Sequence, residues 1–305
     1  MDVSIIIVNY NTKELTKNCL QSIYQQTKDV EFEVIVSDNG SVDGSVGMIK
    51  DLFPSVVLVE NNANLGFGAA NNRGLEVAKG KYVLYLNSDT VLLNNAVKIF
   101  FDYFEAFGEK ESLGVLGGSL YSPEMLYIGC GGKFMGINHE LRVAFIDFLR
   151  IQKNSFFPKK NAFKSSNKAN EFSPYRGVID YVYGCDMFLK NDQMAKFDER
   201  FFMYREEEDL QLQIFRANKK AYILDEPKII HYDGASSRIN KNLSVMDYYR
   251  SFSKLNTMVS SVLFAKKNYN APIRVFVLKM LVFFSMLNFR LYPASKKYLK
   301  KIWSF

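Results

Sequence analysis

Short apolar runs alternate with amphipathic segments in the first part of the chain. Val3 to Val8 is an apolar, mostly β-branched run, which predicts a strand buried on both faces. Comparable runs predict further strands at 33–37, 56–60 and 81–86. Strands that recur at this spacing, with helical segments between them, predict an α/β fold with a mostly parallel central sheet flanked by helices.

Helices are predicted over 13–26 and 68–79. Thr12 is placed to cap the first helix at its N-terminus, and Gly80 to end the second. The acidic and Asn-rich loops follow the carboxyl ends of the predicted strands. That edge is where open α/β sheets bind their ligands.

The pattern is less regular after residue 90. Residues 150–177 are polar and basic, which favours a flexible loop or lid. A strand that enters a helix is predicted over 178–190. A late strand is predicted over 221–230, ending at His231.

The composition indicates a folded protein with a sizeable core, because 48% of the 305 residues are apolar. The three cysteines are odd in number and widely spaced, so neither a disulfide framework nor a zinc site is expected, and a reducing compartment fits best. The first residues contain no basic stretch and no small-residue cleavage site, so no signal peptide is expected.

Charge divides the chain into an expected domain at 1–245 and a tail at 246–305. The tail holds eleven Lys or Arg and one acid, Asp247. Its apolar run at 273–290 is interrupted by Lys279 and is too short for a single membrane span. It predicts a helical extension that lies on an anionic membrane surface, although a core or dimer helix would look similar. The expected head-group contacts are Lys296, Lys297, Lys300 and Lys301.

Four consecutive acids, Glu206 to Asp209, follow an aromatic run. Like charges this close raise one another's pKa, so such a cluster is expected where it faces water, binds a cation or takes up a proton. The cluster could also be the acidic first turn of a helix, which the helix dipole favours. Asp89 lies far upstream, directly after a predicted strand. Acids at these two places indicate metal-assisted group transfer.

Other polar residues at strand ends each allow two interpretations. The Gly- and Asn-rich loop 61–74 could receive a diphosphate on its backbone amides, or be a plain turn. Asp38 could accept the imide N–H of a pyrimidine base, or form an Asx-turn with Gly40. Asp89 could hold a divalent cation together with diphosphate oxygens, or cap a helix. His231, like most single histidines, could be structural.

Six motifs occur in order along residues 1–236. They are SIIIVNYN at 4–11, VSDNGSVDGS at 36–45, NANLGFGAANNRG at 62–74, YLNSDT at 85–90, FDERFFMYREEEDLQLQ at 197–213 and IIHYDGAS at 229–236. In these motifs the chain resembles the family 2 glycosyltransferases with a GT-A fold, and within them the bacterial rhamnosyltransferase-like branch that builds surface polysaccharides.

The resemblance implies a nucleotide-sugar site. Its residues would be Asn9, Asn11, Asp38, Gly66, Asn71, Asn72, Asn87 and Asp89. Asp38 would contact the pyrimidine base. Asp89 would hold Mg²⁺ or Mn²⁺ against the diphosphate, with His231 as a further ligand. Gly184 and Asp186 would lie on the acceptor side.

The family's Glu-Asp pair, which supplies the general base, falls on Glu206 and Glu207. Glu207 stands where the family has Asp and is longer by a methylene, so both glutamates stay candidates. The implied reaction is an inverting, metal-dependent transfer from a nucleotide-sugar donor to a glycan or lipid-linked acceptor. L-rhamnose from dTDP-rhamnose is the expected donor. UDP-galactofuranose, UDP-glucose and UDP-N-acetylglucosamine are alternatives.

Two rival functions have sequence features that test them. A nucleotidyltransferase would want a Gly-, Arg- or Lys-rich loop after the first strand, where this chain has Asn9-Tyr10-Asn11. A catalytically silent sugar-nucleotide sensor is favoured only by the substitution at Glu207. Nucleic acid is not an expected partner, because the positive charge is concentrated in the tail. The expected location is the cytoplasm, at the inner face of the bacterial cell membrane.

Overall fold

The computed structural model describes residues 1–305 except 108, 111, 158–173 and 233–243. The chain divides into two compact units. An α/β unit contains residues 1–134, 168–200 and 206–236, and a helical unit contains residues 135–167, 201–205 and 237–305. The helical unit therefore takes in more than the tail expected after residue 245. In particular, it includes the five residues directly before the acidic cluster.

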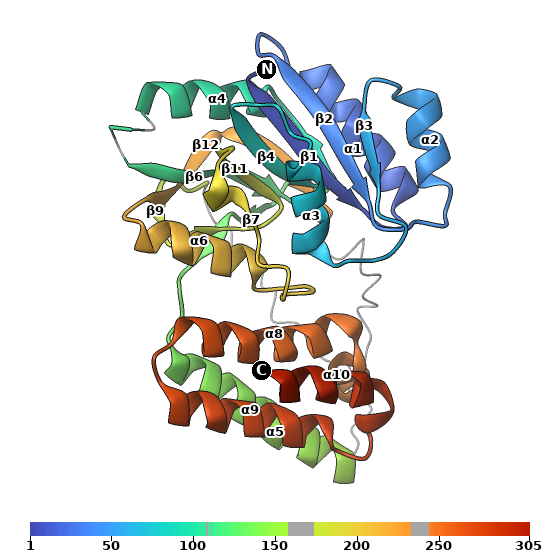
Figure 1. Ribbon diagram of the computed structural model, residues 1–305, viewed down its shortest axis with the longest axis vertical. Coiled ribbons are helices and arrows are strands. Elements are labelled where there is room, and N and C mark those ends of the chain that lie inside the picture. Colours follow the sequence, from blue (N-terminus) through green and yellow to red (C-terminus); the bar gives the residue numbers. More distant parts are fainter. Residues whose placement is uncertain (108, 111, 158–173, 233–243) are drawn as a thin grey trace. The chain divides into compact units, whose positions relative to one another are not determined.

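The α/β unit is built around one large mixed sheet (Figure 1). Its strands are β1 (Val3–Asn9), β2 (Phe32–Asp38), β3 (Val57–Glu60), β4 (Tyr82–Asn87), β5 (Thr90–Leu92), β6 (Leu113–Tyr121), β7 (Tyr127–Gly129), β9 (Gly177–Ile179), β11 (Asp186–Lys190) and β12 (Lys220–His231). The main order is β3-β2-β1-β4-β11-β6-β12-β5. Strands β1 to β4 are mutually parallel, whereas β11 runs antiparallel to both β4 and β6. A small second sheet pairs β8 (Gly131–Gly132) with β10 (Tyr181–Val182).

Helices cover both faces of this sheet. They are α1 (Lys13–Gln26), α2 (Ser45–Leu52), α3 (Phe67–Leu75), α4 (Ala96–Phe107) and α6 (Glu206–Arg216), with a 3-10 turn at Gln193–Ala195. Side chains alternate between the faces along β1: Ile5 and Ile7 pack in the core formed with α1, α2 and α4, and Ile6 packs in the core formed with α3 and α6. Burial on both faces explains the continuous apolar run.

The four strands expected at the start of the chain and the helix over 13–26 are confirmed. The second helix is shorter than expected and ends at Leu75. Gly80 does not cap it but lies against β1, where a Cβ atom would be 2.4 Å from the backbone nitrogen of Ser4. The prediction of a strand that enters a helix over 178–190 was wrong, because short strands occupy this region. Much of the loop expected over 150–177 lies outside the described residues, and a helix continues to Phe156.

The helical unit consists of α5 (Ile137–Phe156), α7 (Val245–Arg250), α8 (Phe252–Asn268), α9 (Pro272–Met286) and α10 (Tyr292–Ser304). Ser251 caps α8 by accepting a hydrogen bond from the backbone of Lys254, and Pro272 begins α9. Buried side chains of α5, α7, α8, α9 and α10 form one core. Within the described residues, none of the helices has the length and apolar character needed to cross a membrane.

The register of the sheet brings the expected site residues to one edge. Asn9 pairs with Asp38, and Val8 pairs with Asn87, so the carboxyl ends of β1, β2 and β4 lie together. Strand β11 runs the other way and begins at this same edge, where Asp186 pairs with Leu86.

Candidate active site

Asp38 is held by three hydrogen-bond donors at the end of β2. Its Oδ1 accepts from Asn9 Nδ2 at 2.6 Å, and its Oδ2 accepts from the backbone amides of Gly40 and Ser41 at 3.1 and 2.9 Å. The Asx-turn considered as the alternative for Asp38 is therefore present. It fixes the carboxylate and the loop that follows it, whereas contact with a base stays a prediction.

Asn9 organises this loop from inside the protein. Its Nδ2 donates to Asp38 and to Ser41 Oγ, and its Oδ1 accepts from the hydroxyls of Thr12 and Thr16, both at 2.8 Å. The amide is fully buried and its hydrogen-bonding groups are used, so Asn9 positions Asp38. Thr12 stands at the N-cap of α1 but makes no capping hydrogen bond, because its hydroxyl turns to Asn9. The expected capping role of Thr12 was wrong.

Asn11 has a left-handed backbone, with φ of 54°. Its side-chain Oδ1 accepts a hydrogen bond from the backbone amide of Val42, and its backbone amide donates to Ser41 Oγ. The loop after β1 is thereby tied to the loop after β2.

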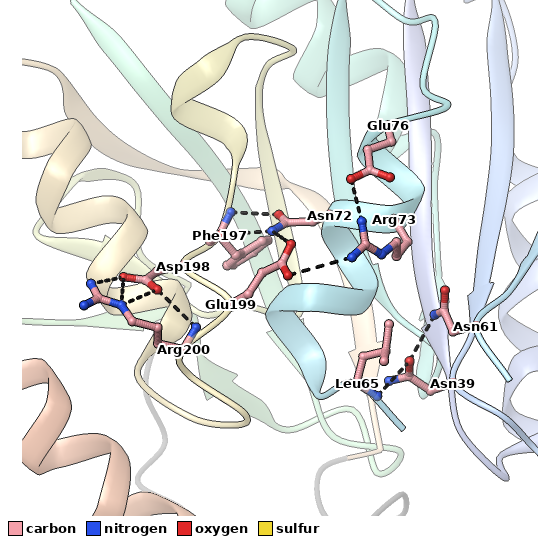
Figure 2. Close-up of polar contacts among 10 residues, drawn as sticks. All are labelled: Asn39, Asn61, Leu65, Asn72, Arg73, Glu76, Phe197, Asp198, Glu199 and Arg200. Carbon is pink, nitrogen blue, oxygen red and sulfur yellow. Dashed lines mark hydrogen bonds and ion pairs between the residues drawn. The ribbon is translucent and has the colours of Figure 1, made fainter. Parts of the chain in front are cut away.

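The Gly- and Asn-rich loop is held by Asn39, a residue that sequence reasoning did not select (Figure 2). Asn39 Oδ1 accepts from Asn61 Nδ2 at 3.0 Å and from the backbone of Leu65 at 3.5 Å. Its Nδ2 donates to the carbonyl of Gly66 at 3.2 Å. Gly66 has φ of 91°, which favours glycine, and α3 begins directly after it. Asn39 directly follows β2, and this position at a strand end is the feature of the sequence that could have identified it.

Asn72 fastens the segment that leads to the acidic helix (Figure 2). Its Nδ2 donates to the carbonyl of Phe197 and to Glu199 Oε1, and its Oδ1 accepts from the backbone amide of Phe197. The Phe197 ring packs edge-on against Tyr85 of β4. Asn71 is also buried and donates to the carbonyl of Phe67. These bonds give both residues positioning roles, while contact with a donor stays a prediction.

Asp89 and His231 meet at the sheet edge. His231 Nε2 lies 3.3 Å from Asp89 Oδ1, and Asp89 is buried. Nearby in sequence, Asn87 Oδ1 is buried and has no hydrogen-bond partner among the described residues. Such an orphaned oxygen is costly, and a hard cation is one group that would satisfy it.

The donor set at this place fits a divalent cation only in part. In the described part of the chain no group of three or more histidines, cysteines or acids is placed to hold a metal. Asp89, His231 and the orphaned oxygen of Asn87 are nevertheless oxygen and nitrogen donors of the kind that Mg²⁺ or Mn²⁺ accepts when substrate phosphates supply the remaining ligands.

Asp186 is fully buried at the start of β11. Its Oδ2 accepts a hydrogen bond from the backbone amide of Gly118 at 2.6 Å. Burial raises the pKa of this carboxyl to about 8, and the amide of Gly118 and the charge of His231 oppose the rise. The side chain is therefore mainly protonated at neutral pH. Its role on the acceptor side stays a prediction.

Glu206 to Asp209 form the first turn of α6. This confirms the second interpretation of the acidic cluster, an acidic helix start that the helix dipole favours. The same turn brings the two candidate bases to the edges of the site. A Cβ atom on Gly68, in α3, would lie 3.7 Å from Glu206 Cβ, and one on Gly184 would lie 3.2 Å from Glu207 Cβ. Glu206 therefore lies beside the start of α3, and Glu207 lies against the segment expected on the acceptor side.

The five residues before α6 have an unusual backbone. Tyr204 and Arg205 are both left-handed, with φ of 68° and 72°. For residues other than glycine this conformation costs on the order of 1 kcal/mol or more each. Contacts within the helical unit hold the segment: Arg205 forms an ion pair with Glu140 and lies over the Phe264 ring. The sequence shows no periodicity that could have revealed this.

Comparison with known proteins finds a family model that is similar to the first part of the α/β unit. The family model described as Glycosyl transferase family 2 matches residues 4–116, which span β1 to the first part of β6. The matched region contains Asn9, Asp38 and Asp89. The acidic helix lies outside it.

Two curated relatives are similar to part of this chain. A poly(ribitol-phosphate) beta-glucosyltransferase from Bacillus spizizenii is 32% identical over 39% of this chain and 19% of its own length. A UDP-Glc:alpha-D-GlcNAc-diphosphoundecaprenol beta-1,3-glucosyltransferase from Escherichia coli is 32% identical over 44% of this chain and 57% of its own length. The chain thus covers less than two thirds of either relative.

A solved structure shares the fold. It is a mannosyltransferase from Pyrobaculum calidifontis in complex with GDP-Man and Mn2+, with a TM-score of 0.55 and 14% identity. The match covers 96% of this chain and 73% of that one. The expected GT-A fold is confirmed.

Proposed function

We propose that the chain is an inverting enzyme of glycosyl transferase family 2, the family whose model matches residues 4–116. It transfers a sugar from a nucleotide-sugar donor to the hydroxyl of a glycan or lipid-linked acceptor. The reaction uses Mg²⁺ or Mn²⁺. The relatives named above support the reaction class, and the residues at the sheet edge support the mechanism.

The first turn of α6 carries this proposal. Glu206 lies beside Gly68 of α3, while Glu207 lies beside Gly184. A general base must be within reach of the proton that it removes. The placement of Glu207 beside Gly184 suits a base for an acceptor that approaches from that side. We therefore assign the base to Glu207 and keep Glu206 as the alternative.

The donor occupies the carboxyl edge of β1, β2 and β4. Asp38 presents a fixed carboxylate to the imide N–H of a pyrimidine base. The N-terminus of α3, after Gly66, offers backbone amides and the positive end of a helix dipole to the diphosphate. A cation held by Asp89 and His231 would neutralise the charge on the leaving diphosphate.

The chemistry is a single displacement. The acceptor oxygen attacks the anomeric carbon as the bond from that carbon to the diphosphate oxygen breaks, and the electron pair leaves with the nucleoside diphosphate. The acceptor proton passes to the carboxylate of Glu207. Attack from the face opposite the leaving group inverts the anomeric centre, and no covalent enzyme intermediate forms.

We take dTDP-rhamnose as the donor and L-rhamnose as the sugar transferred, because of the motif resemblance. A UDP-sugar is the second candidate, favoured by the Escherichia coli relative, whose name includes UDP-Glc. Asp38 would meet the same imide group in thymine and uracil, so it does not separate the two. A thermal-shift panel of dTDP- and UDP-sugars with Mn²⁺ does, because a ligand specific for the folded state raises its melting temperature.

Two substitutions test the mechanism. Glu207→Gln and Asp89→Ala should each lower turnover of the purified enzyme by at least about a hundredfold, the scale of losing a general base or a cation contact. Glu109→Gln is a matched control, because that side chain is 93% exposed. Near-normal transfer by both Glu207→Gln and Asp89→Ala would refute the assignment.

A further inference from the structure

The two units carry opposite charge. The helical unit holds 20 Lys or Arg and three Asp or Glu, a net charge of +17. The α/β unit has the remaining 19 Lys or Arg and 29 Asp or Glu, a net charge of −10. Excess basic charge on one unit is suited to an anionic partner. The sequence indicated a basic tail at 246–305 as the membrane contact. The excess positive charge, however, belongs to the whole helical unit.

Helix α9 is apolar on two opposite faces. One face packs in the core of the helical unit through Leu278, Val282 and Met286. The other face is exposed. Its apolar side chains, spaced as one stripe along the helix, are Ile273, Phe276, Val277, Phe284 and Leu287. Ile273 is 79% exposed and Phe276 is 59% exposed. A helix that is apolar on a solvent-facing side marks a surface for an apolar partner.

Helix α5 adds a second exposed stripe. Phe145, Leu149 and Phe156 are exposed and follow helical spacing. Helices α5 and α9 lie side by side in the helical unit (Figure 1). The Phe156 ring is 6.1 Å from the ring of Phe289, which follows α9. The exposed stripe of α5 therefore reaches the residues that follow α9, and the two stripes together are named here the α5–α9 face.

Basic side chains flank this face. On α9, Arg274 and Lys279 lie on opposite sides of the exposed stripe, as helical spacing requires. On α5, Arg150 and Lys153 are exposed beside Leu149 and Phe156. The acids of α5 do not offset them, because Glu140 pairs with Arg205 and Asp147 with Lys254.

We propose that the α5–α9 face binds the surface of an anionic lipid bilayer, with the apolar stripes in the acyl boundary and the flanking cations at the head groups. A second copy of this chain is the less favourable occupant, because two faces of strongly positive units repel each other. Lipid supplies both the apolar layer and the negative charge that this face lacks.

Flotation of the full chain with vesicles tests the proposal. The probe vesicles are pure phosphatidylcholine and phosphatidylcholine with phosphatidylglycerol. We expect the protein to bind the anionic vesicles and to bind the neutral ones at least about tenfold more weakly. Trp303, the only tryptophan, packs against Phe283 of α9 and should shift its fluorescence to shorter wavelength on binding.

The variant Phe276→Glu/Phe284→Glu should lower partition to anionic vesicles by at least about tenfold. Both side chains are exposed, so the fold is expected to be kept. Leu52→Glu on α2 of the α/β unit is the matched control, because Leu52 and Phe284 are each 53% exposed. The control should bind as the unaltered chain does. No donor is needed for binding, so the result is independent of the proposed transferase activity.

Three outcomes would overturn the proposal. The first is equal partition of the double variant and the unaltered chain. The second is the absence of any binding to anionic vesicles. The third is a dimer in sedimentation experiments that Phe276→Glu/Phe284→Glu dissociates while vesicle binding is absent, which would make a second copy the occupant of the α5–α9 face.

Discussion

The two units treat their buried acids differently. In the helical unit each buried acid is paired with a cation. Glu140 forms an ion pair with Arg205. Asp147 accepts a hydrogen bond from Lys254 Nζ at 2.6 Å and another from the hydroxyl of Tyr249 at 2.7 Å. Their charges are thereby neutralised within the core.

In the α/β unit the buried acids of the sheet edge are held mainly by neutral groups. Asp38 accepts from Asn9 and from two backbone amides, and Asp186 accepts from the amide of Gly118. Asp89 lies beside His231. In the described ranges, none of these three carboxyls forms an ion pair with a lysine or an arginine.

The difference separates structural acids from acids available for chemistry. A buried carboxylate that is paired with a cation cannot leave that cation without a large cost, so it serves the fold. A carboxyl held by amides keeps its capacity to bind a metal or a proton, and its pKa follows its burial. Substitutions of an acid, or of a residue beside an acid, in either unit test this difference.

The largest effect is expected for Asp186→Asn. The pKa of Asp186 is about 8 in the folded state and near 4 in an unfolded chain. Between these values the folded state binds the additional proton, so the free energy of unfolding falls as pH rises, by about 1.4 kcal/mol per pH unit. The effect is complete above the folded pKa. Asparagine cannot ionise, so the variant should lack this loss.

Urea denaturation from pH 5 to pH 8 measures the effect. The stability of the Asp186→Asn variant relative to the unaltered chain should increase across this range by a few kcal/mol. Asp51→Asn is the control, since Asp51 is exposed on α2 and should leave the pH dependence unchanged. Parallel pH profiles for Asp186→Asn and the unaltered chain would show that Asp186 is ionised when folded, against the comparison drawn above.

The next effect is expected for Glu140→Gln in the helical unit. The substitution removes the carboxylate that forms an ion pair with the half-buried Arg205, which costs on the order of 3 kcal/mol. It also loosens the strained residues Tyr204 and Arg205, which directly precede Glu206. Turnover should therefore fall several-fold with the KM for donor unchanged.

A double-mutant cycle separates the ion pair from general damage. Adding Arg205→Gln to Glu140→Gln should restore part of the lost stability, because the charge that Glu140 balanced is then removed as well. Glu140→Asp keeps the charge and should rescue part of the turnover. If the double variant is as unstable as the sum of the two single variants, the pair contributes no coupling and the helical unit does not neutralise its acids as described.

The sequence predicted the edge of the sheet better than the contacts that shape it. Apolar runs indicated the first strands, and the strand ends then located Asp38 and Asp89, because chain direction alone places parallel strand ends together. Asn72 shows the limit. Its bonds reach Phe197, 125 residues away, and no local pattern encodes such a contact.

The helical unit shows the same limit on a larger scale. The sequence indicated an apolar, basic tail but not that residues 201–205 pack with it. That packing includes the ion pair of Arg205 with Glu140, an acid within a helix that has no distinguishing pattern in the sequence. The boundary between the units is therefore set by side-chain contacts. It does not coincide with residue 246, where the composition of the chain changes.

The smallest effect is expected for Gly184→Ala in the α/β unit. The new Cβ atom would lie 3.2 Å from Glu207 Cβ, so Glu207 must move by a few tenths of an ångström. A small displacement of a reacting group is costly, and we expect turnover to fall about tenfold. Gly47→Ala is the control, because a Cβ there meets nothing within 4 Å. An unchanged turnover for Gly184→Ala would mean that the position of Glu207 is not critical, and Glu206, beside Gly68, would then be the better candidate for the base.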